Sequence, residues 1–392
     1  MPEDQLAYVL VTPHTIRKSR TGPILSRLLS RSGLELVSAR MFAPRKELVE
    51  AYAATAVSED DPNPRHRATQ EHIREYILHH LAPNAEGQRA RCLMLVLRGP
   101  DAVSRVMNTV GHIVHGRSSA ETIRDTYGDY VTDEAGSVTY FEPAVLAAPT
   151  AKAVETGLKL WAQHSDTDGG LLEDVVPFPA GDPVEKTLVL IKPDNFRFPN
   201  ARPGGVIDLF SRTGLSIIGF KVHHMSVAQA MEFYGPVLDV LQDKLRGPAG
   251  KQARLAVEGA LGFKLSDDTE TQLGELLGPL AGRNNWEELV AFMAGSRTDE
   301  VPDQAGREKP GTKMCIAIVY QGVDAVRKIR EVLGPTDPSK APTGSIRKEY
   351  GQTIMVNAAH ASDAKENAAR EMKIIRIEEN NFRALIESAY RG

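Results

Sequence analysis

Two segments near the C-terminal end of the chain contain the residue types that phosphoryl transfer needs. His360 lies in Asn357-Ala358-Ala359-His360-Ala361-Ser362-Asp363, and Arg347 ends the earlier loop Thr343-Gly344-Ser345-Ile346-Arg347. Imidazole is a good nucleophile near neutral pH. A guanidinium stabilises the charge on a phosphoryl group during its transfer. The pair therefore indicates a histidine that attacks a phosphoryl group.

The residues after His360 predict a helix that would support this histidine. Ser362 or Asp363 can cap a helix, and Glu366 follows Asp363 at the spacing of a capping box. The N-terminus of that helix would offer amide groups and the positive end of its dipole to an anion. Glu371 lies about three turns further along the same face. A carboxylate there could hold one ring nitrogen and leave the other to attack. The alternative is an ordinary surface or core histidine.

Three further residues could contact phosphate. Lys192 ends a strand-like run in Lys192-Pro193-Asp194, Arg330 lies in a charged helix, and Thr336 begins the turn Thr336-Asp337-Pro338. Taken alone, Lys192 is more simply explained as a surface lysine, Arg330 as a solvated arginine and Thr336 as a turn residue. Arg347 alone is more simply explained as a member of an ion pair.

Composition narrows the class of protein. The chain has 392 residues, is 42% hydrophobic and 25% charged, and carries a formal net charge of −4 without a run of Lys or Arg. This favours more than one globular domain and disfavours binding of nucleic acid. No apolar stretch reaches the roughly 18 residues of a membrane helix, and the acidic start lacks a signal-peptide core. We therefore expect a cytoplasmic protein that does not bind membranes. The two cysteines, Cys92 and Cys315, make neither a disulfide framework nor a zinc site.

The two halves of the sequence resemble each other. Moving the first half forward places Asp101-Ala102-Val103 on Asp324-Ala325-Val326 and Arg124 on Arg347, which indicates two copies of one structural unit. The expected strands are Tyr8–Thr12, Leu34–Met41, Leu93–Leu97 and Gly128–Thr132 in the first half, and Thr187–Lys192, Leu215–Val222, Ile316–Tyr320 and Gly351–Val356 in the second. With the helices between them, they predict an α+β protein of two tandem ferredoxin-like α/β sandwich domains with antiparallel four-stranded sheets.

The domain boundaries follow from composition. We predict a first domain over 1–163, a linker over 164–184 that contains Asp-Gly-Gly and several prolines, and a second domain over 185–392. The second domain carries extra sequence at about 246–285 and 296–313, where we expect surface insertions or a lid.

The second half resembles the nucleoside diphosphate kinase family. The resemblance covers most of Lys186–Arg376 apart from the insertions. It is carried by Lys192-Pro193-Asp194, Tyr234, Gly334-Pro335-Thr336-Asp337-Pro338, Gly344-Ser345-Ile346-Arg347 and the segment around His360. The resemblance implies a ping-pong kinase, in which His360 takes the γ-phosphoryl group from a nucleoside triphosphate and returns it to a nucleoside diphosphate.

The resemblance also implies roles for the surrounding residues. Contacts with the nucleotide phosphates are implied for Lys192, Arg330, Thr336 and Arg347, and a contact near the ribose and phosphates for Asn357. Tyr234 would lie beside the histidine, with Ser362 and Glu371 as its hydrogen-bonding supports. Mg²⁺ would be carried by the phosphates of ATP or another nucleoside triphosphate, without direct protein ligands.

The sequence departs from the family pattern at several positions. Lys348 and Ala361 stand where glycine is usual, and Glu349-Tyr350 follows Lys348. The insertions fall where a base-stacking residue would be sought, and Trp286 and Leu289 are the candidates.

The first half resembles the same family but lacks most of the site. Thr12, Met107, Ile113 and Ala147 stand in place of Lys192, Arg330, Thr336 and His360, Pro149 and Leu158 replace Ser362 and Glu371, and Arg124 alone is kept. We therefore expect one active and one degenerate domain, packed as a pseudo-dimer that could form a homo-oligomer. The alternatives are a non-catalytic nucleotide-binding or scaffold protein, and a nucleic-acid-binding ferredoxin-like module. The latter would need basic runs and paired sheet aromatics, which the sequence lacks.

Overall fold

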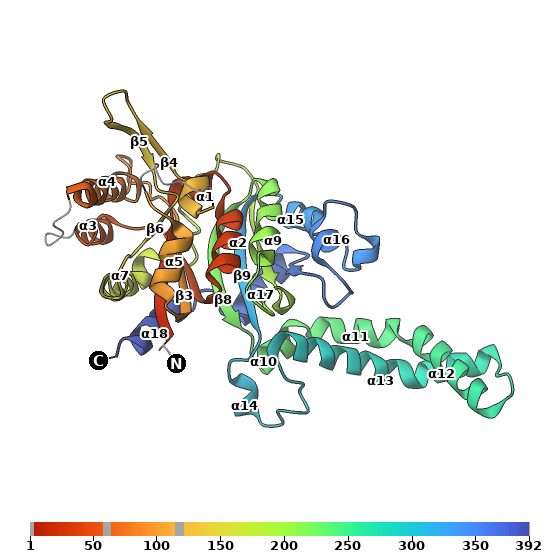
Figure 1. Ribbon diagram of the computed structural model, residues 1–392. Helices are drawn as coiled ribbons and strands as arrows, with labels where there is room; N and C mark the ends of the chain where they lie inside the picture. Colours follow the sequence, from red (N-terminus) through yellow and green to blue (C-terminus); the bar gives the residue numbers. More distant parts are fainter. Residues whose placement is uncertain (1–3, 58–63, 114–120, 392) are drawn as a thin grey trace. The chain divides into compact units, whose positions relative to one another are not determined.

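The computed structural model describes residues 4–57, 64–113 and 121–391, and it divides into two compact units (Figure 1). One unit, called the sandwich unit below, comprises Met1–Val222 and Ile316–Gly392. The other, called the helical unit, comprises His223–Cys315. Both halves of the repeat therefore contribute to the sandwich unit.

The sandwich unit contains one four-stranded sheet from each half. The first consists of β1 (Asp4–Val11), β2 (Glu35–Phe42), β3 (Cys92–Pro100) and β6 (Val145–Ala147), in the spatial order β2-β3-β1-β6. The second consists of β7 (Val184–Ile191), β8 (Ser216–His224), β9 (Met314–Val323) and β10 (Ala359–Ala361), in the order β10-β7-β9-β8. Equivalent strands occupy equivalent positions in the two sheets. The α+β class with two ferredoxin-like sandwiches and antiparallel sheets is confirmed.

The central strands are buried, and helices pack on them. Val9–Val11 and Leu188–Ile191 have no measurable exposure, which explains why they read as continuous apolar runs. The helices α5 (Ala102–Val110) and α7 (Ala151–Gln163) contact β1, and α15 (Ala325–Leu333) and α17 (Lys365–Ile374) contact β7. The other elements of this unit are α1 (Pro13–Arg17), α2 (Thr21–Ser32), α3 (Lys46–Ala54), α4 (Pro64–His80), α6 (Ile123–Tyr127), β4 (Asp129–Thr132), β5 (Val138–Glu142), α8 (Ser165–Asp168), α9 (Arg202–Phe210), α16 (Ile346–Tyr350) and α18 (Asn381–Ala389), with 3-10 turns at Pro193–Asn195, Ser211–Thr213 and Pro338–Lys340.

The predicted strand over Gly128–Thr132 is confirmed as β4, but it is not the fourth strand of its sheet, and the predicted strand over Gly351–Val356 is wrong. β4 pairs with β5 in a separate two-stranded sheet, and Gly351–Val356 is a loop. In that loop the amides of Gln352 and Thr353 both donate to the carbonyl of Val356, at 2.8 and 3.2 Å, so the backbone is closed on itself. The true fourth strands are the short β6 and β10. A three-residue strand is too short to show a periodicity in sequence.

The strand register corrects the alignment of the two halves by one residue. His360 pairs with Leu190, which lies two residues before Lys192. In the first half the residue two before Thr12 is Leu10, and it pairs with Leu146. Leu146 therefore occupies the position of His360, and the prediction of Ala147 is wrong. The same register puts Ala148 and Gly157, instead of Pro149 and Leu158, at the positions of Ser362 and Glu371. The first half still lacks a nucleophile.

The two halves contact each other through equivalent helices. α2 and α9 lie side by side in Figure 1, and their glycines meet. A Cβ atom on Gly22 would lie 2.5 Å from the amide nitrogen of Asp208, and one on Gly204 would lie 2.3 Å from the carbonyl oxygen of Gly22. The C-terminal helix α18 packs on α7 and β2 of the first half, where Phe382 is fully buried.

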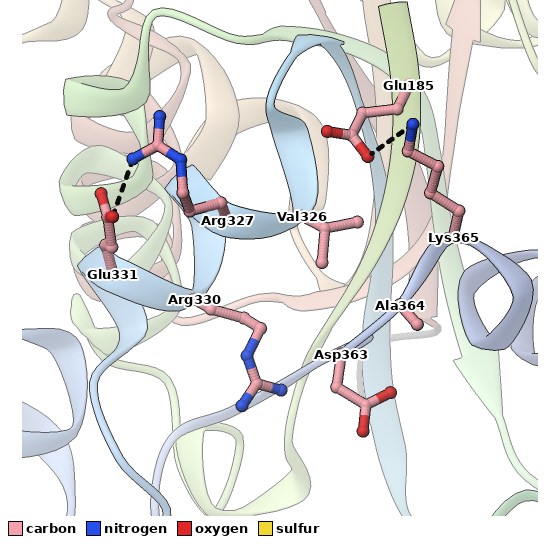
Figure 2. Close-up of a pocket in the computed structure, with 8 residues that line it drawn as sticks. All are labelled: Glu185, Val326, Arg327, Arg330, Glu331, Asp363, Ala364 and Lys365. Atoms are coloured by element: carbon pink, nitrogen blue, oxygen red, sulfur yellow. Dashed lines mark hydrogen bonds and ion pairs between the residues drawn. The ribbon is translucent and has the colours of Figure 1, made fainter.

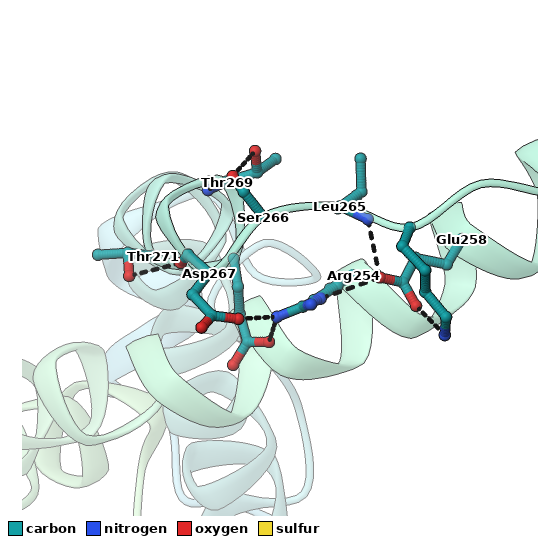
Figure 3. Close-up of polar contacts among 9 residues, drawn as sticks. Arg254, Glu258, Leu265, Ser266, Asp267, Thr269 and Thr271 are labelled. Carbon is teal, nitrogen blue, oxygen red and sulfur yellow. Dashed lines mark hydrogen bonds and ion pairs between the residues drawn. The ribbon is translucent and has the colours of Figure 1, made fainter.

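The helical unit contains the extra sequence of the second half. Its elements are α10 (Val227–Phe233), α11 (Gly235–Lys244), α12 (Arg246–Leu261), α13 (Asp267–Ala294) and α14 (Gln304–Glu308). α11 and α12 pack along α13, whose Gly274, Gly278 and Gly282 allow close backbone approach. Where α12 turns into α13, Arg254 pairs with Glu258, Asp267 and Glu270 (Figure 3). The expected insertion over 246–285 is therefore helical.

Candidate functional site

One ring nitrogen of His360 lies against a buried carboxylate. His360 lies on β10 and Glu371 on α17, and the imidazole Nε2 lies 2.9 Å from Glu371 Oε2. Ser362 donates its hydroxyl to the same oxygen at 2.6 Å. Glu371 and Ser362 are buried, whereas the histidine side chain is 24% exposed. A carboxylate at Nε2 favours the tautomer with the proton on Nε2, so the lone pair of the neutral ring belongs to Nδ1.

The predicted capping box beside His360 is wrong. α17 begins after Ala364, which has no side chain that can cap it. Ser362 donates its hydroxyl to Glu371 instead, and Asp363 accepts a hydrogen bond from the side-chain Nδ2 of Asn367 at 2.6 Å. Ser362 and Asp363 are therefore engaged with other side chains, and neither caps α17.

Arg347 braces the backbone next to His360. Its guanidinium donates to the carbonyl of Gly334 at 2.9 Å and to the carbonyl of Ala359 at 3.1 Å. In the first half Arg124 donates to the carbonyls of Gly111 and Val145, at 2.8 and 3.2 Å. The same pair of hydrogen bonds therefore exists in the half that has no nucleophile. Holding the backbone is thus part of the arginine's role in both halves.

Lys192 lies in the same cluster. It is 5% exposed and donates to Asn357 Oδ1 at 3.0 Å and to the carbonyl of Met355. Asn357 in turn donates to the carbonyl of Thr336 at 3.1 Å. Burial lowers the pKa of Lys192 to about 8, with Arg347 acting in the same direction. The structure thus brings together Lys192, Thr336, Arg347 and Asn357 from distant parts of the sequence.

Arg330 approaches the site from α15. It lines an open cavity of about 590 Å³, and its guanidinium lies towards Asp363 (Figure 2). The cavity is also lined by Glu185, Val326, Arg327, Glu331, Ala364 and Lys365. The hydrogen bond from the side-chain amide of Asn367 lowers the pKa of Asp363, and the positive charge of Arg330 lowers it further. Arg330 and the segment that carries His360 are therefore neighbours.

Tyr234 and the two candidates for base stacking belong to the helical unit. Tyr234 is buried, and its carbonyl accepts a hydrogen bond from the indole of Trp286 at 2.9 Å. Trp286 is 3% exposed, which leaves little of its ring for a ligand, and Leu289 is half-buried. The predicted place of Tyr234 beside the histidine stays a prediction.

The sequence did not reveal three features of the site. Ala358 has a φ of +69°, a strained conformation for a residue with a Cβ, just before the strand of His360. Asp194 is buried beside it, although only Lys192 of its motif was given a role. The side chain of Ile354 is 63% exposed, and its carbonyl accepts a hydrogen bond from Asn357, so it offers an apolar surface beside the polar cluster. A positive φ at alanine has no sequence signal.

The sequence around His360 is similar to that of known proteins. A family model described as "Nucleoside diphosphate kinase" matches residues 308–380, which include Arg330, Arg347, His360 and Glu371. The nucleoside diphosphate kinase of Chlamydia muridarum is 30% identical over 189 residues, which are 48% of this chain and 90% of that protein. The chain belongs to the nucleoside diphosphate kinase family. The nucleoside diphosphate kinase of Chlamydia abortus is 28% identical over the same shares of the two chains.

Solved structures of the nucleoside diphosphate kinase family also match. The Aquifex aeolicus structure is 25% identical, with a TM-score of 0.30, and covers 49% of this chain and 94% of its own. The Pyrobaculum aerophilum structure is 28% identical, with a TM-score of 0.30, and covers 49% and 95%. No helix among the described residues is long and apolar enough to cross a membrane.

Proposed function

We propose that the protein is a nucleoside diphosphate kinase that transfers the γ-phosphoryl group through a phosphohistidine on His360. The observation that carries the proposal is the contact of Nε2 with the buried Glu371, because it fixes the ring and assigns the lone pair to Nδ1. Arg347, Lys192 and Arg330 supply positive charge around the same segment. Phosphoryl transfer depends mainly on such positioning and charge neutralisation.

The proposed reaction has two steps. In the first, the lone pair of Nδ1 attacks the γ-phosphorus, the bond to the β,γ-bridging oxygen breaks, and a nucleoside diphosphate leaves. In the second, a terminal oxygen of another nucleoside diphosphate attacks the phosphohistidine, and the P–N bond breaks. Glu371 stabilises the positive charge that the ring carries as phosphohistidine forms. The ring then returns to its starting tautomer.

The charge of the site suits a nucleotide that brings its own magnesium. Among the described residues, no group of three or more His, Cys, Asp or Glu side chains is placed to hold a metal ion. The cluster is instead cationic, and we propose that Lys192, Arg330 and Arg347 contact the phosphate oxygens when a nucleotide is bound. Mg²⁺ bound to those phosphates would neutralise charge that develops on the leaving oxygen.

We further propose that the two halves function as a pseudo-dimer in the cytoplasm. Two features support this arrangement: α2 packs closely on the equivalent α9, and α18 of the second half docks on the first. In that docking, Asn380 donates to Ser165 Oγ at 2.7 Å and to Asp166 Oδ1 at 2.6 Å, and Arg383 pairs with Asp166 at 2.6 Å. The first half would thus support the fold of the second without carrying out transfer itself.

The proposal is tested by exchange between two different nucleotides. The intact chain is mixed with ATP, GDP and Mg²⁺, and the products are separated by ion-exchange chromatography. We expect GTP and ADP to form in equal amounts. If the chain binds nucleotides but no GTP forms, it is a nucleotide-binding or scaffold protein and not a kinase.

A further inference from the structure

Asp194 is a buried carboxylate that the proposed reaction does not use. Its side chain is 1% exposed, Oδ2 accepts a hydrogen bond from the amide of Ala358 at 3.3 Å, and Arg202 lies 3.8 Å away. The other oxygen, Oδ1, is buried and has no hydrogen-bond partner among the described residues. Burial raises the pKa of Asp194, and the nearby positive charge of Lys192 opposes that change. A buried charge is costly unless it is matched, so this carboxylate needs an explanation.

The repeat shows that the backbone does not require this carboxylate. The first half has His14 at the position of Asp194, yet Ala144 keeps the strained conformation of Ala358, with a φ of +59°. The carbonyl of the strained residue is held in both halves. Thr15 Oγ1 donates to the carbonyl of Ala144 at 2.7 Å. Asn195 Nδ2 donates to the carbonyl of Ala358 at 2.8 Å. Holding the strained turn is therefore not a sufficient reason for an aspartate.

The first half lacks both the lysine and the aspartate of this motif. The first half has Thr12 at the position of the lysine and His14 at the position of the aspartate. In the second half the ammonium is buried, and its hydrogen bonds to Asn357 Oδ1 and to the carbonyl of Met355 go to uncharged oxygens. Burial favours the neutral amine, whereas hydrogen bonds to acceptors and a nearby negative charge favour the ammonium.

We propose that Asp194 is a positioning residue that acts through Lys192: its negative charge keeps the buried lysine protonated, so that an ammonium is ready for the phosphates of a nucleotide. The protonation of Lys192 does not depend on the proposed function. The role of the ammonium in phosphoryl transfer, in contrast, rests on the proposed function.

The charges around Lys192 determine how its pKa should change when Asp194 is neutralised. Burial and Arg347, from α16, lower the pKa of Lys192 to about 8, whereas Asp194, on the same turn, raises it. Arg202, from α9, pairs with Asp194 and helps to keep it ionised. Neutralising Asp194 should therefore lower the pKa of Lys192 further, and the ammonium would be lost as the pH rises through the neutral range.

The kinetic test uses Asp194→Asn, which removes the charge and keeps an oxygen for the amide of Ala358. The dependence of kcat/KM on pH reports groups of the free enzyme. We expect the alkaline limb of the wild type at about pH 8 and that of Asp194→Asn about one unit lower. At about pH 6 the two rates should agree within a few-fold, because Lys192 is protonated in both. Equal loss at every pH, with the limb unmoved, would show a structural role only.

A second measurement is independent of catalysis. Lysine labelled with ¹³C at Cε is incorporated into the intact chain, and the Lys192 resonance, assigned with Lys192→Arg, is titrated without nucleotide. Asp194→Asn and the smaller Asp194→Ser should both lower its midpoint, and Asp194→Glu should restore it. Unchanged midpoints in both uncharged variants would overturn the proposal. A lowered midpoint in a chain that transfers no phosphate would uphold it and would contradict only the proposed kinase activity.

Discussion

Replacement of His360 by alanine should abolish nucleotide exchange. His360 is the histidine whose Nε2 is held by the buried Glu371, and the first half has Leu146 at the same position of its sheet. Alanine offers no nucleophile, so both steps of the proposed transfer fail. Loss of a nucleophile typically lowers turnover by roughly 10⁵-fold or more. We expect no GTP above background from ATP and GDP, with the thermal unfolding temperature close to that of the wild type.

The matched control for this variant is His14→Ala. His14 is also partly buried beside a tyrosine hydroxyl and a glutamate, with Nδ1 2.8 Å from Tyr76 Oη and Nε2 3.3 Å from Glu142 Oε1. It lies in the first half, so its loss should leave exchange within a few-fold of the wild type. A His360→Ala variant that still turns over at the parent rate would remove His360 from the mechanism. Loss of activity in His14→Ala alone would move the site to the first half.

The second large effect is expected at Arg347, and the repeat supplies its control. Arg347 and Arg124 each donate to two backbone carbonyls at equivalent positions, so alanine at either position removes an equivalent brace. Only Arg347 lies in the half that has a nucleophile. We expect Arg347→Ala to lower kcat/KM on the order of 10²-fold or more, because a charge contact with the transferring group is lost. Arg124→Ala should lower stability with little effect on kcat/KM.

The two arginine variants are compared by thermal unfolding and by exchange kinetics in the intact chain. Arg347→Lys should also be impaired, because an ammonium cannot reproduce the guanidinium fork. If Arg347→Ala and Arg124→Ala lose similar stability and both keep their rates within a few-fold, the arginine of the second half is a brace only.

Much of this fold and site could be predicted from the sequence because the decisive elements have strong local patterns. The central strands are fully buried, and so their apolar runs stand out. The polar residues around His360 come from a few short motifs, and the structure places Lys192, Thr336, Arg347 and Asn357 together. A buried lysine at the end of a strand can reach a loop that is distant in sequence, and the motif alone does not say which loop.

Other features depended on tertiary contacts. The fourth strands are three residues long and are defined by pairing with β1 and β7, so the alignment of Ala147 with His360 was one residue out. Ser362 was expected to cap α17, but the buried Glu371 competes for its hydroxyl. The charge relation between Asp194 and Lys192 depends on the burial of both side chains, which the sequence does not show.

The most direct test of the central claim is to locate the phosphate in the intact chain. The protein is incubated with γ-labelled ATP and Mg²⁺, digested under alkaline conditions that preserve phosphohistidine, and analysed by mass spectrometry. We predict a single acid-labile phosphate on the peptide that contains His360, no phosphate on peptides from residues 4–163, and its removal by GDP with formation of GTP. Phosphate on the first half, or formation of GTP without phosphate on His360, would contradict the account.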